Sequence, residues 1–457
     1  METLVLWMVF GVVMAAALVQ ARVKGNKLRH WQLTPQLMLV ASFFLYSSAM
    51  PISRIFWRSD ATATDIPFME TNILAALGIF AGLYLSRFVS PPGTSQPRAV
   101  SAPWPASLCI FTAVAALLAA VAYALYSVGM QVSNLFTPYG FETTVTEAGT
   151  LDNLAYVIVN ACIIRSYFAA LTHPSKSRQL KRVVLLIASL ICALMLIRGM
   201  RNNVVILILP MIGMSLQNRR LPLMKTLAAV FAGFLIFSVV AAERTFGIAE
   251  GRNNDIAVNY DPLGGELGTT FNVYAESDNI LSGRELQLGK TYVVGFATNL
   301  VPRALWPDRP PSPAVEFSQI YYGTDQLPFG LGYSPVVEAI TNFSVYGVPC
   351  VFAAASIFVV LLAGYLRRRG GWGTLSYWMM LPMILNWNRI DFSASGKMFL
   401  VYVAFFIIID ALVNRPATAA PAARRRALAQ FALWSASQES GLRAQVAGPD
   451  GGRTRPR

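Results

Sequence analysis

The sequence predicts an all-α polytopic membrane protein of about eleven transmembrane helices. Of its 457 residues, 55% are hydrophobic and only 13% are charged, a composition far from that of soluble domains. Apolar runs long enough to cross a hydrocarbon core of about 30 Å recur as far as residue 413. These runs are continuously apolar, whereas the strands of a transmembrane β-barrel alternate in polarity, so a barrel is excluded.

Hydropathy defines each expected span as an apolar run between polar loops. The spans are 2–21, 33–52, 68–89, 104–129, 151–172, 183–198, 203–217, 223–242, 345–366, 373–388 and 398–414. The short loops 22–29, 176–182, 219–225 and 367–369 are rich in Lys and Arg. The positive-inside rule makes these loops cytoplasmic, the N-terminus periplasmic and the C-terminus cytoplasmic. The net charge of +14 therefore reports orientation, and no nucleic acid is expected as a partner.

The chain divides into four expected segments. These are an N-terminal bundle of about eight helices (1–242), a large external loop (243–334), the C-terminal transmembrane helices (335–414) and a cytoplasmic, disordered basic tail (415–457). The external loop is rich in aromatic residues, which suit either sugar rings or anchoring at the membrane interface. Its segments GELGTTFNVYAESDNILSG and PAVEFSQIYYG carry apolar residues at helical spacing, which predicts short helices lying over the bundle.

Cations in the external loops are the first candidate site residues. They form three pairs: Arg198 with Arg201, Arg303 with Arg309, and Arg389 with Lys397. In RGMRNN the first pair is three residues apart, hence on one helical face if the helix continues. Guanidinium groups bind phosphate oxygens in pairs, so the set suits the pyrophosphate of a lipid carrier. The alternative is that each long side chain reaches for ordinary phospholipid headgroups.

A polar stripe is expected at the beginning of the helix in GLGYSPVVEAITNFSVYG. Ser334 is a plausible N-cap and Pro335 suits the first helical position. Ser334, Glu338 and Asn342 then follow one another at intervals of four residues, which puts them on one face.

The same helix is too long for one membrane span. A continuous helix over 335–366 would measure about 48 Å at 1.5 Å per residue. Gly347 and Pro349 are expected to divide it. The first part would then lie at the interface and present Glu338 to a cavity.

Two carboxylates are candidates for acid–base work. A partly desolvated Glu338 can act as general base on a sugar hydroxyl, or it can be a capping or ion-paired structural acid. Asp391 is the second candidate, although a local pair with Arg389 is the simpler interpretation. No DxD motif or carboxylate cluster accompanies these loops, so we expect a reaction without a metal or another cofactor.

These motifs, in this order, resemble the Wzy-type O-antigen polymerases, nearest to the branch that polymerises enterobacterial common antigen. The similarity covers roughly residues 180–413. The matching positions are Gly199 and Arg201 in a Gly-x-Arg turn; Pro307, Arg309 and Pro310 in a Trp-Pro-x-basic-Pro element; Gly332, Ser334, Glu338 and Asn342 at the late acidic helix; and Arg389 and Asp391 in the last external loop. Ser344 departs from the family where it tends to have glycine, and Arg198 is an additional cation.

The resemblance implies a GT-C-like glycosyltransferase of the bacterial inner membrane. Such an enzyme transfers a growing glycan from undecaprenyl pyrophosphate onto the non-reducing end of a lipid-linked repeat unit at the periplasmic face. Membrane lipid and a chain-length regulator are the implied partners besides the lipid-linked oligosaccharides. The implied catalytic residues are Glu338, Asp391 and Arg201, and the implied substrate-binding residues are Arg198, Arg201, Arg303, Arg309, Arg389, Lys397, Asn342 and Trp306.

Two other functions fit the same composition. An O-antigen ligase would share fold and donor, but that family resembles a pattern with an external catalytic histidine, and His30 and His173 lie in loops predicted to be cytoplasmic. A flippase or other transporter of lipid-linked glycans would also line its path with charges, and it would need alternating access.

Overall fold

The fold was examined in a computed structural model, which describes fifteen stretches of the chain. They are 2–21, 30–31, 33–53, 65–89, 104–127, 129–130, 149–173, 175–198, 200–217, 221–222, 267–277, 285–301, 305–306, 308–322 and 332–413. The chain separates into two compact units, Met1–Ile408 and Ile409–Arg457. The first unit holds every candidate site residue, and the packing described below belongs to it.

The described chain is almost entirely helical. The long helices are α1 (Glu2–Ala21), α2 (Pro35–Ser53), α3 (Asp65–Val89), α4 (Ala106–Ser127), α5 (Gly149–Thr172), α6 (Ser177–Ile197), α7 (Arg201–Leu216), α13 (Pro335–Arg367), α14 (Gly371–Trp387) and α15 (Phe392–Val413). The short elements are α9 (Thr269–Ala275), the π-helical turn η3 (Thr291–Gly295), α11 (Phe296–Leu300), α12 (Pro313–Tyr322) and two antiparallel two-residue strands, β1 (His30–Trp31) and β2 (Leu221–Pro222). The short helices expected in the large loop are confirmed by α9 and α12.

Within the described stretches, seven helices are long and apolar enough to cross a membrane, by length and composition. They span Pro35–Ile52, Asp65–Val89, Ala106–Ser127, Leu154–Thr172, Ser177–Ile197, Pro335–Arg367 and Phe392–Leu412. Shorter apolar helices occupy Val5–Ala21 and Arg201–Leu216. The prediction of a helical multi-pass membrane protein is therefore confirmed. The expected span 223–242 and the basic tail 415–457 lie outside the described residues, and eleven spans remain a prediction.

Contacts between helix ends show which loops lie on the same face of the unit. The first face carries loops that are predicted to be cytoplasmic. His30 pairs with Pro222 across β1 and β2, which joins the loops that follow α1 and α7. The Tyr167 hydroxyl near the end of α5 lies 2.6 Å from the hydroxyl of Ser215 near the end of α7. These ends carry basic loops in the sequence, so the grouping agrees with the alternation of spans.

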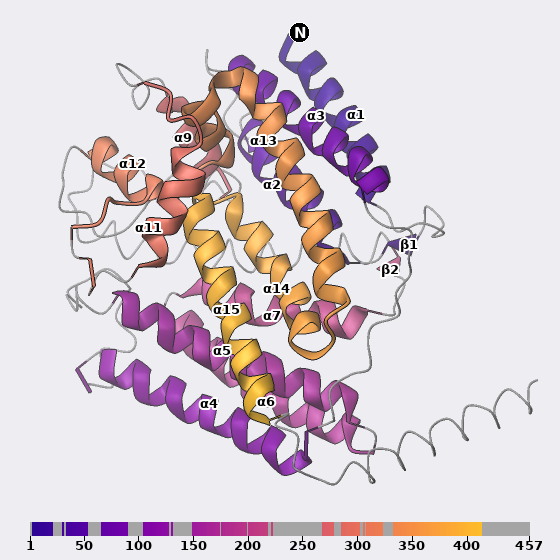
Figure 1. The fold of residues 1–457 in the computed structure, drawn as a ribbon, viewed down its shortest axis with the longest axis vertical. Helices are drawn as coiled ribbons and strands as arrows, with labels where there is room; N and C mark the ends of the chain where they lie inside the picture. The colour runs from indigo at the N-terminus through magenta and orange to yellow at the C-terminus, as the bar shows by residue number, and fades with distance from the viewer. Residues whose placement is uncertain are drawn as a thin grey trace, which may run out of the picture. The chain divides into compact units, whose positions relative to one another are not determined.

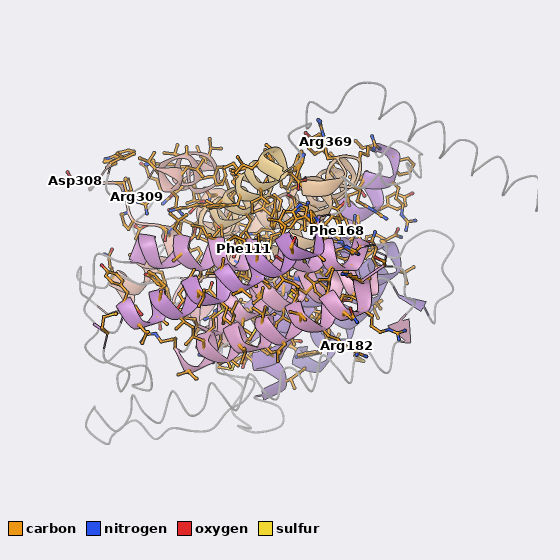
Figure 2. The ribbon with its side chains drawn as sticks, turned by 90° about the horizontal axis from the view of Figure 1, so that it is seen from below. Phe111, Phe168, Arg182, Asp308, Arg309 and Arg369 are labelled. Atoms are coloured by element: carbon orange, nitrogen blue, oxygen red, sulfur yellow. The ribbon has the colours of Figure 1, made fainter. Side chains whose placement is uncertain are left out.

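The opposite face collects the loops predicted to be external. Nη2 of Arg198, just after α6, donates to Oγ of Ser127 at the end of α4 over 3.0 Å. The backbone N–H of Tyr333 donates to the carbonyl of Arg389 over 2.6 Å, which joins the beginning of α13 to the turn after α14. Figure 2 shows Arg309 at one end of the unit and Arg182 and Arg369 toward the other.

Helix α13 is anchored to the N-terminal helices by close packing on α3. A Cβ atom added to Gly78 would collide with the backbone of Pro349, and one added to Gly82 would collide with that of Ala353. The small residues let the two helices approach, and they compensate for the proline inside α13. The part of α13 around Pro349 and Ala353 is thus held closely against α3. This packing fixes the position from which the first turns of α13 extend.

The break in α13 lies at Ser344, and the expected division at Gly347 and Pro349 is wrong. Ser344 has φ 65° and ψ 176°, whereas Gly347 and Pro349 continue the helix. This conformation is one that only glycine adopts without strain. The residues from Pro335 to Phe343 consequently form a separate short helix, whose last carbonyls have lost their helical donors.

Candidate functional site

The polar stripe at the beginning of α13 is fully buried. Ser334 occupies the N-cap position with extended backbone angles, and Pro335 follows at the first helical position, as predicted. Ser334, Glu338 and Asn342 each have 0% exposure. The Ser334 side chain makes no capping hydrogen bond, so its hydroxyl is available for another role.

Glu338 binds the beginning of the last long helix. Its Oε2 accepts a 3.0 Å hydrogen bond from the backbone N–H of Phe392, the first residue of α15. A helix N-terminus carries partial positive charge and stabilises a carboxylate. Its other oxygen, Oε1, is buried and has no hydrogen-bond partner among the described residues. One oxygen therefore fixes the side chain and the other is left to accept a hydrogen bond.

Asp391 caps the same helix, and its expected local pair with Arg389 stays a prediction. Its Oδ1 accepts hydrogen bonds from the hydroxyl of Ser393 and, over 2.8 Å, from the backbone N–H of Ala394. The first turn of a helix has unpaired N–H groups, and an N-cap aspartate satisfies them. Oδ2 has no partner within the described part of the chain. Two carboxyl groups thus converge on one helix N-terminus.

Three hydroxyl groups around these carboxyls also lack partners. Oγ of Ser334 lies one turn before Glu338, and Oγ of Ser395 lies one turn after Asp391; like the phenol oxygen of Tyr292, both are buried without a hydrogen-bond partner in the described chain. Most buried polar groups in proteins are hydrogen-bonded. A cluster of unsatisfied donors and acceptors is therefore typical of a place where a polar ligand or water binds.

Aromatic rings wall this pocket. Tyr292 stacks on Phe343 with centroids 6.4 Å apart and an interplanar angle of 9°, and its edge meets Phe392 at 5.6 Å. Phe296 of α11 lies 5.9 Å from Phe392. We call the buried polar cluster of Ser334, Glu338 and Asp391, together with the rings that border it, the carboxyl pocket.

Two tyrosines lie close enough to the carboxyls for their pKa values to be affected. Burial raises the pKa of the Tyr333 phenol, and the carboxyls of Glu338 and Asp391 are close enough to raise that pKa further. Burial also raises the pKa of Tyr292 well above 10, with Glu338 adding to the effect. Both phenols therefore remain neutral hydrogen-bond donors beside the carboxyls.

Asn342 is occupied by protein contacts rather than directed at a substrate. Its Oδ1 accepts from the backbone N–H of Gly289 over 3.0 Å. Its Nδ2 donates to Oγ1 of Thr291 over 2.6 Å and to the carbonyl of Glu338 over 2.7 Å. The amide thus joins the pocket helix to the segment 285–301.

Arg198 and Arg201 do not share a continuous helix, so the expected common face is wrong. α6 ends at Ile197 and α7 begins at Arg201. Both side chains are buried, with 7% and 8% exposure. Arg198 binds Ser127, and its Nε has no hydrogen-bond partner among the residues described. An unsatisfied guanidinium donor in a buried turn suits an anion, and a phosphate at this turn stays a prediction.

Arg309 closes the end of α11. Its Nη1 donates to the carbonyls of Val301 and Asn299 over 2.8 Å and 3.0 Å. A cation is favourable at this end of a helix because it satisfies the last carbonyls. This position gives Arg309 a structural role in holding the segment over the carboxyl pocket.

The remaining predicted residues occupy several settings. The side chains of Arg389 and Lys397 are half-buried, and that of Trp306 is 42% exposed. Arg303, like Pro307 and Gly199 of the quoted motifs, lies outside the described residues. Glu338 and Asp391 both accept hydrogen bonds from backbone N–H groups in the first turn of α15. The fold therefore brings the two carboxyls together.

Sequence reasoning missed Tyr292, Ser393 and Ser395. Tyr292 is distant in sequence from Glu338, and its only signal was its place in an aromatic loop. The two serines follow Asp391 in DFSAS, a helix-start pattern that could have indicated the cap. Within the described ranges, no group of three or more His, Cys, Asp or Glu residues could hold a metal ion.

The chain was compared with family models, with curated proteins and with solved structures. None of the three comparisons finds a match. The functional argument therefore depends on the geometry of the carboxyl pocket and on the sequence motifs.

Proposed function

We propose that the protein is a membrane glycosyltransferase that elongates a lipid-linked glycan. The donor would be a growing glycan on undecaprenyl pyrophosphate, and the acceptor would be the non-reducing-end hydroxyl of a lipid-linked repeat unit. The reaction would occur at the face that carries the carboxyl pocket, which the positive-inside rule predicts to be external. In this proposal that face is the periplasmic side of a bacterial inner membrane. A GT-C-like arrangement of the helices belongs to the same proposal.

One observation carries this function: a buried carboxyl pocket in which Oε1 of Glu338 has no hydrogen-bond partner among the described residues and unpaired hydroxyls lie close by. Sugar hydroxyls donate and accept hydrogen bonds, so a glycan end would satisfy both kinds of atom. Aromatic rings such as Tyr292, Phe343 and Phe392 offer apolar faces to a sugar ring. Carboxylates beside aromatic rings thus favour a carbohydrate acceptor.

The proposed step uses Glu338 as general base. Oε1 takes the proton of the acceptor hydroxyl while the acceptor oxygen bonds to the anomeric carbon of the donor. The bond between that carbon and the phosphate oxygen breaks, and its electron pair leaves with the carrier pyrophosphate. Asp391 is a weaker candidate for the base because its Oδ1 accepts two hydrogen bonds, which favour the ionised form, whereas Oε2 of Glu338 accepts one.

The buried arginines suit the leaving group. Negative charge grows on the pyrophosphate as the anomeric bond breaks, and preorganised guanidinium groups in a dry site stabilise it. Arg198 and Arg201 are buried at one turn, and Arg198 has an Nε donor without a partner in the described chain. We assign the donor pyrophosphate to this turn and the acceptor to the carboxyl pocket.

Purified protein supplied with a single lipid-linked repeat unit tests the proposal. A ladder of products that differ by one repeat unit is the expected result. Transfer to a lipid A core when that acceptor is added would identify a ligase, and movement of intact substrate across proteoliposomes without turnover would identify a transporter. We expect the ladder to persist in EDTA; its loss in EDTA and recovery with magnesium would contradict a metal-independent reaction.

A further inference from the structure

The segment Glu285–Val301 covers the carboxyl pocket through a small set of contacts. The backbone N–H groups of Gln287 and Leu288 donate to the carbonyls of Thr341 and Asn342 over 3.1 Å and 3.0 Å. Those carbonyls accept bonds from outside the helix because the break at Ser344 has removed their helical donors. Figure 1 shows α11, part of this segment, beside the beginning of α15.

The covered pocket is closed to a large substrate. Glu338 and Ser334 have 0% exposure and Asp391 has 1%. A glycan hydroxyl therefore reaches Oε1 of Glu338 only after a covering element moves. α13, α14 and α15 are long packed helices, whereas Glu285–Val301 contains only short helical turns. Movement of this segment would therefore disturb less packing than movement of one of the three long helices.

Unusual backbone conformations gather at the junction between this segment and the pocket helix. Leu288 has φ 45° and Gly289 has φ 88°, directly before the π-helical turn at Thr291–Gly295. Ser344, on the other side of the junction, has φ 65°. Strained residues and π-turns concentrate at parts of proteins that switch between conformations. The junction therefore has features that are typical of a place where the backbone changes conformation.

We propose that Glu285–Val301 is a lid over the carboxyl pocket and that Asn342 is its latch. Asn342 joins the two sides through Gly289 and Thr291 while holding the carbonyl of Glu338. Opening breaks these bonds and admits the end of a glycan; closing excludes water and returns Glu338 to its place. The purpose of the lid rests on the proposed function, whereas the existence of the lid does not.

Thiol labelling tests the lid without any substrate. The reporter is Ser334→Cys in full-length protein whose four native cysteines have been replaced by serine. Ser334 is fully buried and its hydroxyl has no partner within the described part of the chain, so the change is small. A charged methanethiosulfonate reagent then reports how often the pocket opens. We expect Asn342→Ala to accelerate labelling at least tenfold, because two of the three hydrogen bonds that it removes join the segment to the pocket helix.

Two further variants test whether faster labelling is specific to opening of the lid. Thr291→Val removes one of the three bonds with little change of shape, and we expect about fivefold faster labelling. Ser356→Cys serves as the matched buried reporter, because it has 0% exposure and lies beyond the break, in the part of α13 that packs on α3. Its labelling rate should not change with Asn342→Ala.

Equal labelling of Ser334→Cys with and without Asn342→Ala would overturn the lid. Parallel acceleration at Ser334→Cys and Ser356→Cys would also overturn it, because the whole unit would then have loosened. Faster labelling at Ser334→Cys alone supports the lid even if no ladder of glycans forms, in which case only the proposed function fails. A ladder formed by protein whose labelling is insensitive to Asn342 supports the function and rejects the lid.

Discussion

The carboxyl pocket and the turn between α6 and α7 both bury charge, but they leave opposite hydrogen-bonding groups unsatisfied. In the pocket, Oε1 of Glu338 and Oδ2 of Asp391 are acceptors without partners among the described residues. At the turn, Nε of Arg198 is a donor without one. Acceptors suit the hydroxyls of a sugar, and guanidinium donors suit the oxygens of a phosphate. The comparison therefore favours the pocket as the site of the sugar acceptor and the turn as the site of the donor pyrophosphate in the proposed reaction.

Each region also uses the end of a helix that matches its charge. Glu338 and Asp391 lie at the N-terminus of α15, where negative charge is favourable, and Arg198 follows the C-terminus of α6, where positive charge is favourable. The helix ends explain how these charges are tolerated in a buried setting. They do not explain the unsatisfied atoms, which are therefore the stronger indication of a ligand.

The largest expected effect is that of Glu338→Gln. Glutamine retains an oxygen for the N–H of Phe392 but presents an amide donor where Oε1 accepted. We expect turnover in the ladder assay to fall by about 10² to 10⁴, the range for loss of a general base, with unchanged gel filtration. Glu70→Gln, which alters an exposed carboxylate of α3, is the matched control. Full activity of Glu338→Gln would remove the pocket from the chemistry.

The second effect concerns the arginine turn. We expect Arg201→Ala to slow turnover by about 10² to 10³, because it removes charge stabilisation of the leaving pyrophosphate. Arg178→Ala, at the exposed beginning of α6, should leave turnover unchanged. Single-turnover rates measured at saturating donor separate this loss from weaker substrate binding. If both variants matched the wild type, the division of labour between the two regions would be wrong.

The two regions also differ in how well the sequence predicted them. Hydropathy predicted the long apolar helices, and the spacing of Ser334, Glu338 and Asn342 predicted their shared face at the beginning of α13, because these patterns are local. The break was expected at Gly347 and Pro349 but lies at Ser344, since close packing on α3 holds the proline within the helix. Tertiary packing decided the position of the break.

Partners that come from distant parts of the chain were the least predictable. Composition could not show that Tyr292 lies beside Glu338, because that contact depends on how the large loop folds back on α13. The charge of Arg309 suggested a phosphate ligand, whereas its Nη1 binds the carbonyls at the end of α11. A sequence shows which groups have the right chemistry, and packing determines which of them still have an unsatisfied atom.

The smallest expected effect separates the two carboxyls of the pocket. Asparagine is as good an N-cap as aspartate, so Asp391→Asn should keep α15 capped and reduce turnover less than tenfold. Asp391→Ala removes the cap and should cost about 1 kcal/mol of stability, measured as a lower midpoint in thermal unfolding of the detergent-solubilised protein. A loss of turnover in Asp391→Asn as large as that in Glu338→Gln would make Asp391 a catalytic partner. Because the cap survives in that variant, such a loss would come from the change at Oδ2, where an acceptor oxygen without a partner in the described chain becomes an uncharged amide donor.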